Sequence, residues 1–292
     1  MTKTTETVIA YKGFDKNLQC RGYQYKIGET FTHDGPVKQC ESGFHACQNP
    51  LDVLDHYGLG DGNRFARVIL GGKIDRSDDR KWASAEITIT AELKLPDLIA
   101  DAIKFVRDAC GKGAEGVQAA SGDYSKLAAS GYYSQLAASG YSSKLAASGY
   151  SSQLAASGDY SQLAASGYSS KLAASGYSSQ LAASGDYSQL AASGYSSKLA
   201  ASGYSSQLAA SGDYSKLAAS GDSSKLEISG AKSAAAAVGY NSRVKAAAGC
   251  PVAICEYDAD YNPISFATGI AGQDGVPADT WLIAVSGKLV AA

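Results

Sequence analysis

Apolar and polar positions alternate along the chain with a strict nine-residue period between residues 121 and 228. Twelve units follow the pattern Ser-Gly-(Tyr/Asp)-(Ser/Tyr)-Ser-(Lys/Gln)-Leu-Ala-Ala. A fixed period of this kind is typical of stacked repeats, because each unit buries its apolar side against the next. The nearly invariant Leu-Ala-Ala distinguishes the units from a flexible Gly/Ser linker. We therefore predict a mainly β protein built around a parallel β-solenoid.

The position that alternates between Lys and Gln must face water, and in a strand the residues on either side of it point to the opposite face. The second serine, the leucine and the final alanine of each unit therefore point inward, as in Ser125, Leu127 and Ala129. The fourth position, the Lys/Gln and the first alanine point outward. We expect Ser-Gly to form the corner, because glycine tolerates unusual backbone angles.

A nine-residue unit is compatible with coils of 18 or 27 residues. The order of lysine and glutamine in the array repeats every 27 residues. A 27-residue coil would, however, stack Lys144, Lys171 and Lys198 in one column about 4.8 Å apart, and such a column of like charges is destabilising. An 18-residue coil distributes these lysines over two faces. We predict 18 residues per coil, and seven to eight coils between residues 112 and 249.

The segments on either side of the array have other patterns and predict two further domains. Residues 1–111 are predicted to form a small α+β head that ends in a helix, which starts at Pro96 and caps the solenoid. Residues 250–292 are predicted to form a β-meander that covers the other end. The strands expected in the head are 7–14, 22–27, 64–70 and 85–93, with a short helix from Pro50, and those expected in the C-terminal cap are 251–257, 263–267 and 281–285.

Composition points to a protein of the cytoplasm. Hydrophobic residues make up 45% of the chain, and 26 basic residues nearly balance 28 acidic ones, so no field that attracts nucleic acid or a membrane is expected. The sequence has neither a secretory signal nor a run of about 18 apolar residues. The six cysteines form no CxxC pair, which favours reduced thiols.

All three histidines and several cysteines of the chain lie close together in the head. Structural zinc sites usually show paired short spacings such as CxxC, and these residues do not. The sequence therefore predicts neither a metal site nor a cofactor here. The residues considered as ligands are His33, Cys40, His45 and Cys47, with Cys20 and His56 nearby.

Tyrosine recurs at the outward fourth position of the repeats, where it supplies rigid, amphipathic contact area next to serine, lysine and glutamine. A solvated face without a partner is the alternative interpretation. We interpret the face as a binding surface for another protein, or for a second copy of the chain. The candidate binding residues are Tyr124, Tyr133, Tyr160, Tyr187 and Tyr214.

The chain resembles a group of phage and prophage proteins that have no assigned activity. This resemblance covers nearly the whole chain and implies a viral origin. It rests on the Ala-Ala-Ser-Gly repeats and on the segments Gly43-Phe44-His45-Ala46-Cys47, Asn49-Pro50-Leu51-Asp52-Val53, Ala278-Asp279-Thr280-Trp281 and Gly287-Lys288-Leu289-Val290.

The head also loosely resembles toxin-like ADP-ribosyltransferases, through Tyr11-Lys12-Gly13-Phe14 in a first strand and Gly43-Phe44-His45 before a helix. That resemblance implies a catalytic glutamate on a late strand, for which Glu86 or Glu92 could serve. The favoured prediction is a non-enzymatic binding or scaffold protein of a phage, whose partner is a host or phage protein or a second copy of the chain. The alternatives are a nucleotide-handling enzyme in the head and a structural component of the virion.

Overall fold

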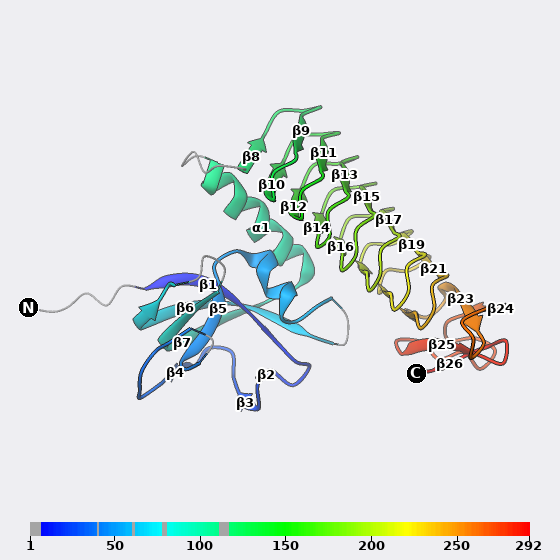
Figure 1. Ribbon diagram of the computed structural model, residues 1–292, viewed down its shortest axis with the longest axis horizontal. Helices are drawn as coiled ribbons and strands as arrows, with labels where there is room; N and C mark the ends of the chain where they lie inside the picture. Colours follow the sequence, from blue (N-terminus) through cyan, green and yellow to red (C-terminus); the bar gives the residue numbers. More distant parts are fainter. Residues whose placement is uncertain (1–6, 40, 60–61, 78–80, 111–116) are drawn as a thin grey trace, which may run out of the picture. The chain divides into compact units, whose positions relative to one another are not determined.

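The computed structural model describes residues 7–39, 41–59, 62–77, 81–110 and 117–292. It divides into two compact units, Met1–Phe105 and Val106–Ala292. The first contains the head and most of the long helix. The second contains the solenoid and its closing strands (Figure 1).

The head is built around a closed ring of antiparallel strands. Strand β1 (Val8–Phe14) pairs with β5 (Phe44–Cys47) and β6 (Arg64–Asp75), and β7 (Lys81–Leu93) pairs with both β5 and β6. A short strand, β4 (Thr30–Thr32), pairs with residues 86–88 of β7. The ring encloses the apolar core of the head, which includes Phe14, Val68, Leu70, Ile87 and Ile89.

Two predicted elements of the head are shorter than expected. The strand predicted at 22–27 is only β3 (Tyr23–Gln24), which pairs with β2 (Gln19–Cys20) across a tight turn whose two residues have positive φ. The predicted short helix is a 3₁₀ helix, η1 (Pro50–Asp55), capped by Asn49, whose side-chain oxygen accepts from the Leu51 N–H at 3.1 Å. Asparagine is a preferred residue at this capping position.

Helix α1 (Leu95–Cys110) is the amphipathic helix that the sequence predicts. It buries Leu98, Ile99 and Ala102, and its Asp101 accepts bidentate hydrogen bonds from Arg67 of β6, at 2.7 to 3.0 Å. The side chains of Ile103 and Val106, also predicted on its apolar face, lie outside the described residues. That the helix caps the solenoid stays a prediction.

The repeat array forms a parallel β-solenoid of about eight turns, from residue 117 to residue 254, with equivalent residues about 18 apart. The 18-residue coil is therefore confirmed. Each coil contributes one strand to each of two sheets. The even sheet contains β8 (Val117–Ala120), β10 (Tyr133–Ala138), β12 (Ser151–Ala156), β14 (Lys171–Ala174), β16 (Gln189–Ala192), β18 (Gln207–Ala210), β20 (Lys225–Ile228) and β22 (Arg243–Ala246); the odd sheet contains β9 (Lys126–Ala129), β11 (Lys144–Ala147), β13 (Gln162–Ala165), β15 (Gln180–Ala183), β17 (Lys198–Ala201), β19 (Lys216–Ala219) and β21 (Ala234–Ala237).

The register places identical residues above one another. Leu163 is aligned with Leu145 and Leu181, and Gln162 with Lys144 and Gln180. The lysines that a 27-residue coil would stack are thereby divided between the sheets, since Lys144 lies in the odd sheet and Lys171 in the even one.

The solenoid interior consists of the inward residues that the alternation predicts. From the second coil onward, the leucines, final alanines and second serines are buried. A buried hydroxyl needs a hydrogen-bond partner, and these serines have one: Ser179 Oγ donates to the Gly176 carbonyl oxygen at 3.0 Å, and the same bond recurs in other units. The buried serines therefore stabilise the corner that precedes their strand.

The repeat glycines have a different role from the one predicted. None of them has a positive φ; in most units the left-handed residue of the corner is the fourth position, as in Tyr124 and Ser142. A Cβ atom on Gly176 would lie 2.1 Å from the carbonyl oxygen of Gly158 in the coil before it. Glycine is therefore required because the backbones of successive coils approach closely, and not because of its conformational freedom.

The C-terminal strands form two hairpins rather than one continuous meander. Strands β23 (Pro251–Tyr257) and β24 (Pro263–Ile270) end the odd sheet, because β23 pairs with β21. Strands β25 (Trp281–Val285) and β26 (Lys288–Ala291) end the even sheet, because β25 pairs antiparallel with β22. Each sheet is therefore closed by its own hairpin, which covers an edge that would otherwise have unpaired backbone groups.

Candidate functional site

The five tyrosines predicted as binding residues are all exposed. Their position differs from the prediction, which placed the fourth residue of each unit on an outward strand face. Tyr124, Tyr160, Tyr187 and Tyr214 lie instead in the corners, with φ between 53° and 58°, and only Tyr133 begins a strand. The serine that follows the fourth position turns inward to bond the corner, and most strands begin at the Lys/Gln position, two residues later than the alternation suggests.

The sequence analysis missed the tyrosines at the third position of the units. Third-position and fourth-position tyrosines occupy the same columns. A unit with Asp at the third position usually has Tyr at the fourth, and a unit with Tyr at the third usually has Ser at the fourth. Two ladders result. The odd-corner ladder lies in the corners that precede the strands of the odd sheet, and the even-corner ladder in those that precede the strands of the even sheet. The odd-corner ladder contains Tyr124, Tyr141, Tyr160, Tyr177, Tyr195 and Tyr214, and the even-corner ladder contains Tyr132, Tyr150, Tyr168, Tyr187 and Tyr204.

Each ladder is a continuous run of rings in contact. Neighbouring ring centroids are 4.9 to 5.8 Å apart in the odd-corner ladder and 4.9 to 5.7 Å apart in the even-corner ladder. These spacings are in the range of favourable aromatic pairs. Every ring of the two ladders keeps between 39% and 68% of its surface exposed. The solenoid therefore displays rigid aromatic columns along both corners.

Lysine or aspartate replaces tyrosine where the ladders end. In the odd corner the next residue is Lys232, which donates to the Tyr214 hydroxyl at 2.9 Å and lies 5.2 Å from the centre of its ring. Lys232 also holds the pKa of Tyr214 below its ordinary value. In the even corner Asp222 and Ser223 interrupt the column, which resumes at Tyr240.

Aspartate at the third position has a backbone role that tyrosine does not share. Asp159 Oδ1 accepts the Tyr177 N–H of the next coil at 2.8 Å, and Asp123 and Asp186 make the same bond to their next coils. In most units the fourth residue donates its backbone N–H to the next coil, as Tyr124 does to the Tyr141 carbonyl and Ser142 to the Asp159 carbonyl, whereas Ser151 and Ser169 donate to the preceding coil. The corner therefore accepts several side chains.

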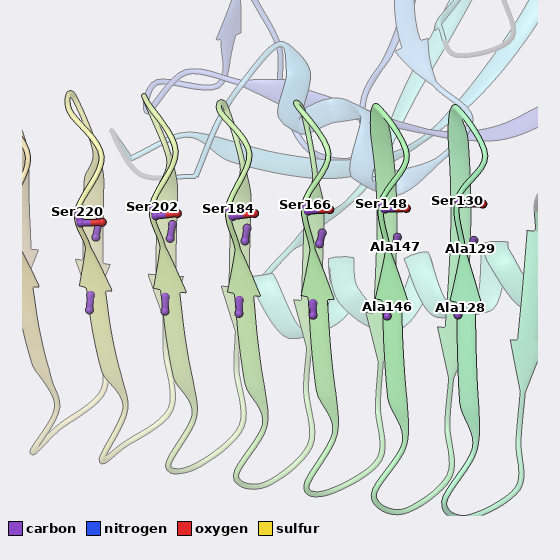
Figure 2. Close-up of a pocket in the computed structure, with 18 of the residues that line it drawn as sticks. Ala128, Ala129, Ser130, Ala146, Ala147, Ser148, Ser166, Ser184, Ser202 and Ser220 are labelled. Carbon is purple, nitrogen blue, oxygen red and sulfur yellow. The ribbon is translucent and has the colours of Figure 1, made fainter.

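A second regular surface lies on the odd sheet, whose outward positions are exposed along its length. Figure 2 shows alanines and serines repeating in columns on successive coils. A third column contains Lys126, Lys144, Gln162, Gln180, Lys198 and Lys216. The outward side chains of this face are small or flexible, and none of those in the three columns is aromatic. Aromatic residues are typical of strong protein contacts.

The head contains a cavity of about 690 Å³ that unites several motifs singled out in the sequence. Its lining includes Lys12 of β1, Gly43 to Cys47, and His33 and His56. Glu86 and Glu92, the glutamates considered for transferase chemistry, are not among its lining residues. Glu92 instead forms a bidentate ion pair with Arg64, at 2.6 and 2.7 Å. Neither glutamate therefore lies in this cavity, and the transferase alternative stays a prediction.

The cysteines and histidines considered as metal ligands do not assemble into a site in the described part of the chain. No group of three or more His, Cys, Asp or Glu residues there is arranged to hold a metal ion, and Cys40 lies outside that part. Cys20, Cys47, Cys250 and Cys255 are free thiols. No described helix has the length and apolar character to cross a bilayer.

His45 is a titratable group of the cavity whose pKa is depressed. Burial, the largest cause, and the positive charges of Lys12, Lys81 and Arg21 together lower the pKa of His45 to about 4. A hydrogen bond with the backbone of Gly43 acts in the opposite sense. The imidazole is therefore uncharged at neutral pH, in a region dominated by cations.

This depressed pKa predicts that the head loses stability as the pH falls from about 6.5 to 4. In that window the unfolded chain takes up a proton at His45 that the folded chain does not. Because the imidazole is partly exposed, we expect a loss of about 1–2 kcal/mol. Urea denaturation followed at several pH values would measure it, with His45→Gln as the control. An unchanged pH dependence in that variant would contradict the assignment.

Comparison with known proteins gives one result, and it concerns the head. A DUF7666 domain covers residues 8–101. The matching family model is described as a domain of unknown function; the match includes the cavity and stops before the repeats. No curated protein and no solved structure matches the chain. The viral origin implied by the sequence resemblance stays a prediction.

Proposed function

We propose that the protein is a non-enzymatic phage protein whose solenoid binds another protein through its tyrosine ladders. The partner is a host protein, such as a component of host defence, or a second copy of the chain, and binding takes place in the host cytoplasm. The observation that carries this proposal is the pair of uninterrupted, exposed tyrosine columns.

The corners do not need tyrosine in order to fold. At the fourth position Tyr124, Ser142, Lys232 and Asn241 all adopt φ between 52° and 58°. At the third position Tyr141, Asp159 and Ala231 provide equivalent backbone acceptors to the preceding coil. A residue that the backbone does not require, yet which recurs in both corners on coil after coil, is best explained by what it contacts outside the chain.

The ladders have the physical properties of a contact surface. Tyrosine has a large ring and few rotatable bonds, so little conformational entropy is lost on binding. Stacking between neighbouring rings fixes them further. Because the same side chain recurs at each coil, several weak contacts would add through multivalency. A longer array would extend the reach of the surface without any change in fold.

Replacing four tyrosines of one ladder tests the proposal. We expect Tyr141→Ser, Tyr160→Ser, Tyr177→Ser and Tyr195→Ser together to weaken partner binding at least a hundredfold, because buried tyrosines are frequent interface hot spots worth about 2 kcal/mol or more each. The β signal in circular dichroism at 25 °C should not change. The partner is recovered with tagged full-length protein from infected cells, and complex mass is measured by light scattering.

The matched control changes four outward residues of the odd sheet to serine, namely Lys144, Gln162, Gln180 and Lys198. This variant should retain binding. Equal binding by the two variants and the parent chain would overturn the proposal. A loss of β signal in the tyrosine variant alone would show that the ladders hold the solenoid together instead.

A further inference from the structure

Lys12 is a buried lysine in the wall of the head cavity, with only 6% of its surface exposed. Its Nζ donates to the His45 carbonyl oxygen at 2.7 Å and is hydrogen-bonded to Cys20. The rings of Phe14 and Tyr25 lie 5.7 and 5.3 Å away. An ammonium group has three N–H donors, so these two hydrogen bonds leave one donor for a further partner.

No carboxylate of the described residues balances this charge. The ionisable groups that act on Lys12 are Cys20, Cys47 and Arg21, of which the last is a second cation. Burial is the largest cause that lowers the pKa of Lys12, and Cys20 and Cys47 act in the opposite direction. A charge removed from water is costly unless it is paired. An anionic ligand in the cavity would provide such a partner for the ammonium group of Lys12.

Arg21 adds a second cation at the same cavity, and the backbone is strained to place it there. Arg21 and Gly22 form the two-residue turn between β2 and β3, with φ of 51° and 77°. Turns with two left-handed residues favour Asn-Gly, and arginine is unfavourable in that conformation. Such strain is typical of functional sites. Arg21 has no ion-pair partner among the described residues.

The acidic residue Glu41 of the cavity lining forms an ion pair with Lys38 at 2.6 Å. His45 responds to the positive charges of Lys12, Lys81 and Arg21 together. Several positive charges therefore act on one part of the cavity.

A cluster of aromatic side chains also lines the cavity. Tyr23 lies 5.0 Å from Tyr25 and 5.8 Å from Phe44, measured between ring centroids, and Tyr23 is 46% exposed. The exposed ring of Tyr23 beside the cavity offers stacking surface to a planar group, and the buried rings of Tyr25 and Phe44 support it. The volume of about 690 Å³ is within the range of small-molecule sites.

We propose that this cavity is a binding site for a nucleoside monophosphate or a similar phosphate that carries a planar ring. Lys12 and Arg21 bind the phosphate, and Tyr23 and Phe44 contact the ring. Arginine and lysine are the usual phosphate-binding side chains. The inference concerns the head alone and does not depend on the proposed role of the tyrosine ladders.

Calorimetry on the full-length protein with AMP, adenosine and inorganic phosphate as separate probes tests this proposal. We expect AMP to bind at least tenfold more tightly than either of the other two. Arg21→Gln should weaken AMP binding at least tenfold, while Lys26→Gln, an exposed lysine outside the cavity lining, should have no effect. Circular dichroism would confirm that both variants fold.

Histidine NMR gives a second readout that a merely structural role of Lys12 and Arg21 would not move. Bound phosphate would offset the nearby cations, so the pKa of His45 should rise from about 4 when AMP is added. AMP that binds no more tightly than phosphate, equal binding by Arg21→Gln and the parent chain, or a His45 titration insensitive to saturating AMP would each overturn the proposal.

Discussion

Replacing Gly176 with alanine is expected to disrupt the stack of coils at the centre of the solenoid, with a loss of about 3 kcal/mol or more. The added Cβ would lie 2.1 Å from the Gly158 carbonyl oxygen and 2.8 Å from the Asp159 nitrogen. Both are backbone atoms, so no rotamer change relieves the overlap. Separating the coils would instead break the interstrand hydrogen bonds on either side. The urea midpoint of the β signal measures the effect.

Gly122 provides a matched control because it occupies the same position of the first repeat. A Cβ atom there would meet nothing closer than Ser125 Oγ, at 3.7 Å. Gly122→Ala should therefore leave the urea midpoint nearly unchanged. Equal destabilisation by the two substitutions would indicate an effect of local backbone freedom, and would contradict the close-approach explanation.

Deleting residues 250–292 is expected to convert the protein into a self-associating species. The deletion removes β23 from the edge of β21 and β25 from the edge of β22. It also removes Val252, Ile254 and Leu282 from the solenoid core. Exposed strand edges pair readily with other chains, and here every chain would present the same edges. Light scattering should show a mass that increases with protein concentration.

The control for this experiment is a chain that is also shortened but keeps its closing hairpins. Removing residues 157–174 deletes one 18-residue coil and restores the register between β11 and β15 and between β12 and β16. This variant should have the same association state as the parent chain. A hairpin deletion that associates no more than this control would show that the closing strands do not protect the edges.

The sequence was sufficient to predict the solenoid because its repeats are nearly identical. Strict periodicity aligns each leucine with the next, and alternation within the short strands separates inward from outward positions. The choice between 18 and 27 residues per coil required a physical argument, the cost of stacking Lys144, Lys171 and Lys198. The observed register confirms it, with Lys144 and Lys171 in different sheets.

The corners could not be predicted in the same way, because their conformation depends on the neighbouring coil. Glycine at the second position suggested a positive φ, but the space available to it is limited by the coil before it. The left-handed residue is the fourth one, which carries a side chain. This difference moves tyrosines of the third and fourth positions into one column. The alternation of Asp-Tyr with Tyr-Ser was the signal that could have revealed the shared column.

The head cavity was only partly predictable, since it assembles residues that are distant in sequence. The segment Gly43 to Cys47 attracted attention as a motif, but the burial of Lys12 depends on the strand ring and on the turn at Arg21. The resemblance to ADP-ribosyltransferases also implied Glu86 or Glu92 as a catalytic residue. Neither lines the cavity, and Glu92 forms an ion pair with Arg64.

Cross-linking across neighbouring coils tests most directly the claim on which the tyrosine ladders depend, that equivalent residues recur every 18 positions. Gln162 and Gln180 are exposed partners in adjacent strands, about 4.8 Å apart at Cα, which is within the range that a disulfide spans. With Gln162→Cys and Gln180→Cys, mild oxidation and peptide mass analysis should find the new disulfide in most chains. The pair Gln162→Cys and Gln189→Cys, which a 27-residue coil would align, should remain unlinked. A disulfide in the second pair and none in the first would contradict the 18-residue coil, and with it the tyrosine ladders.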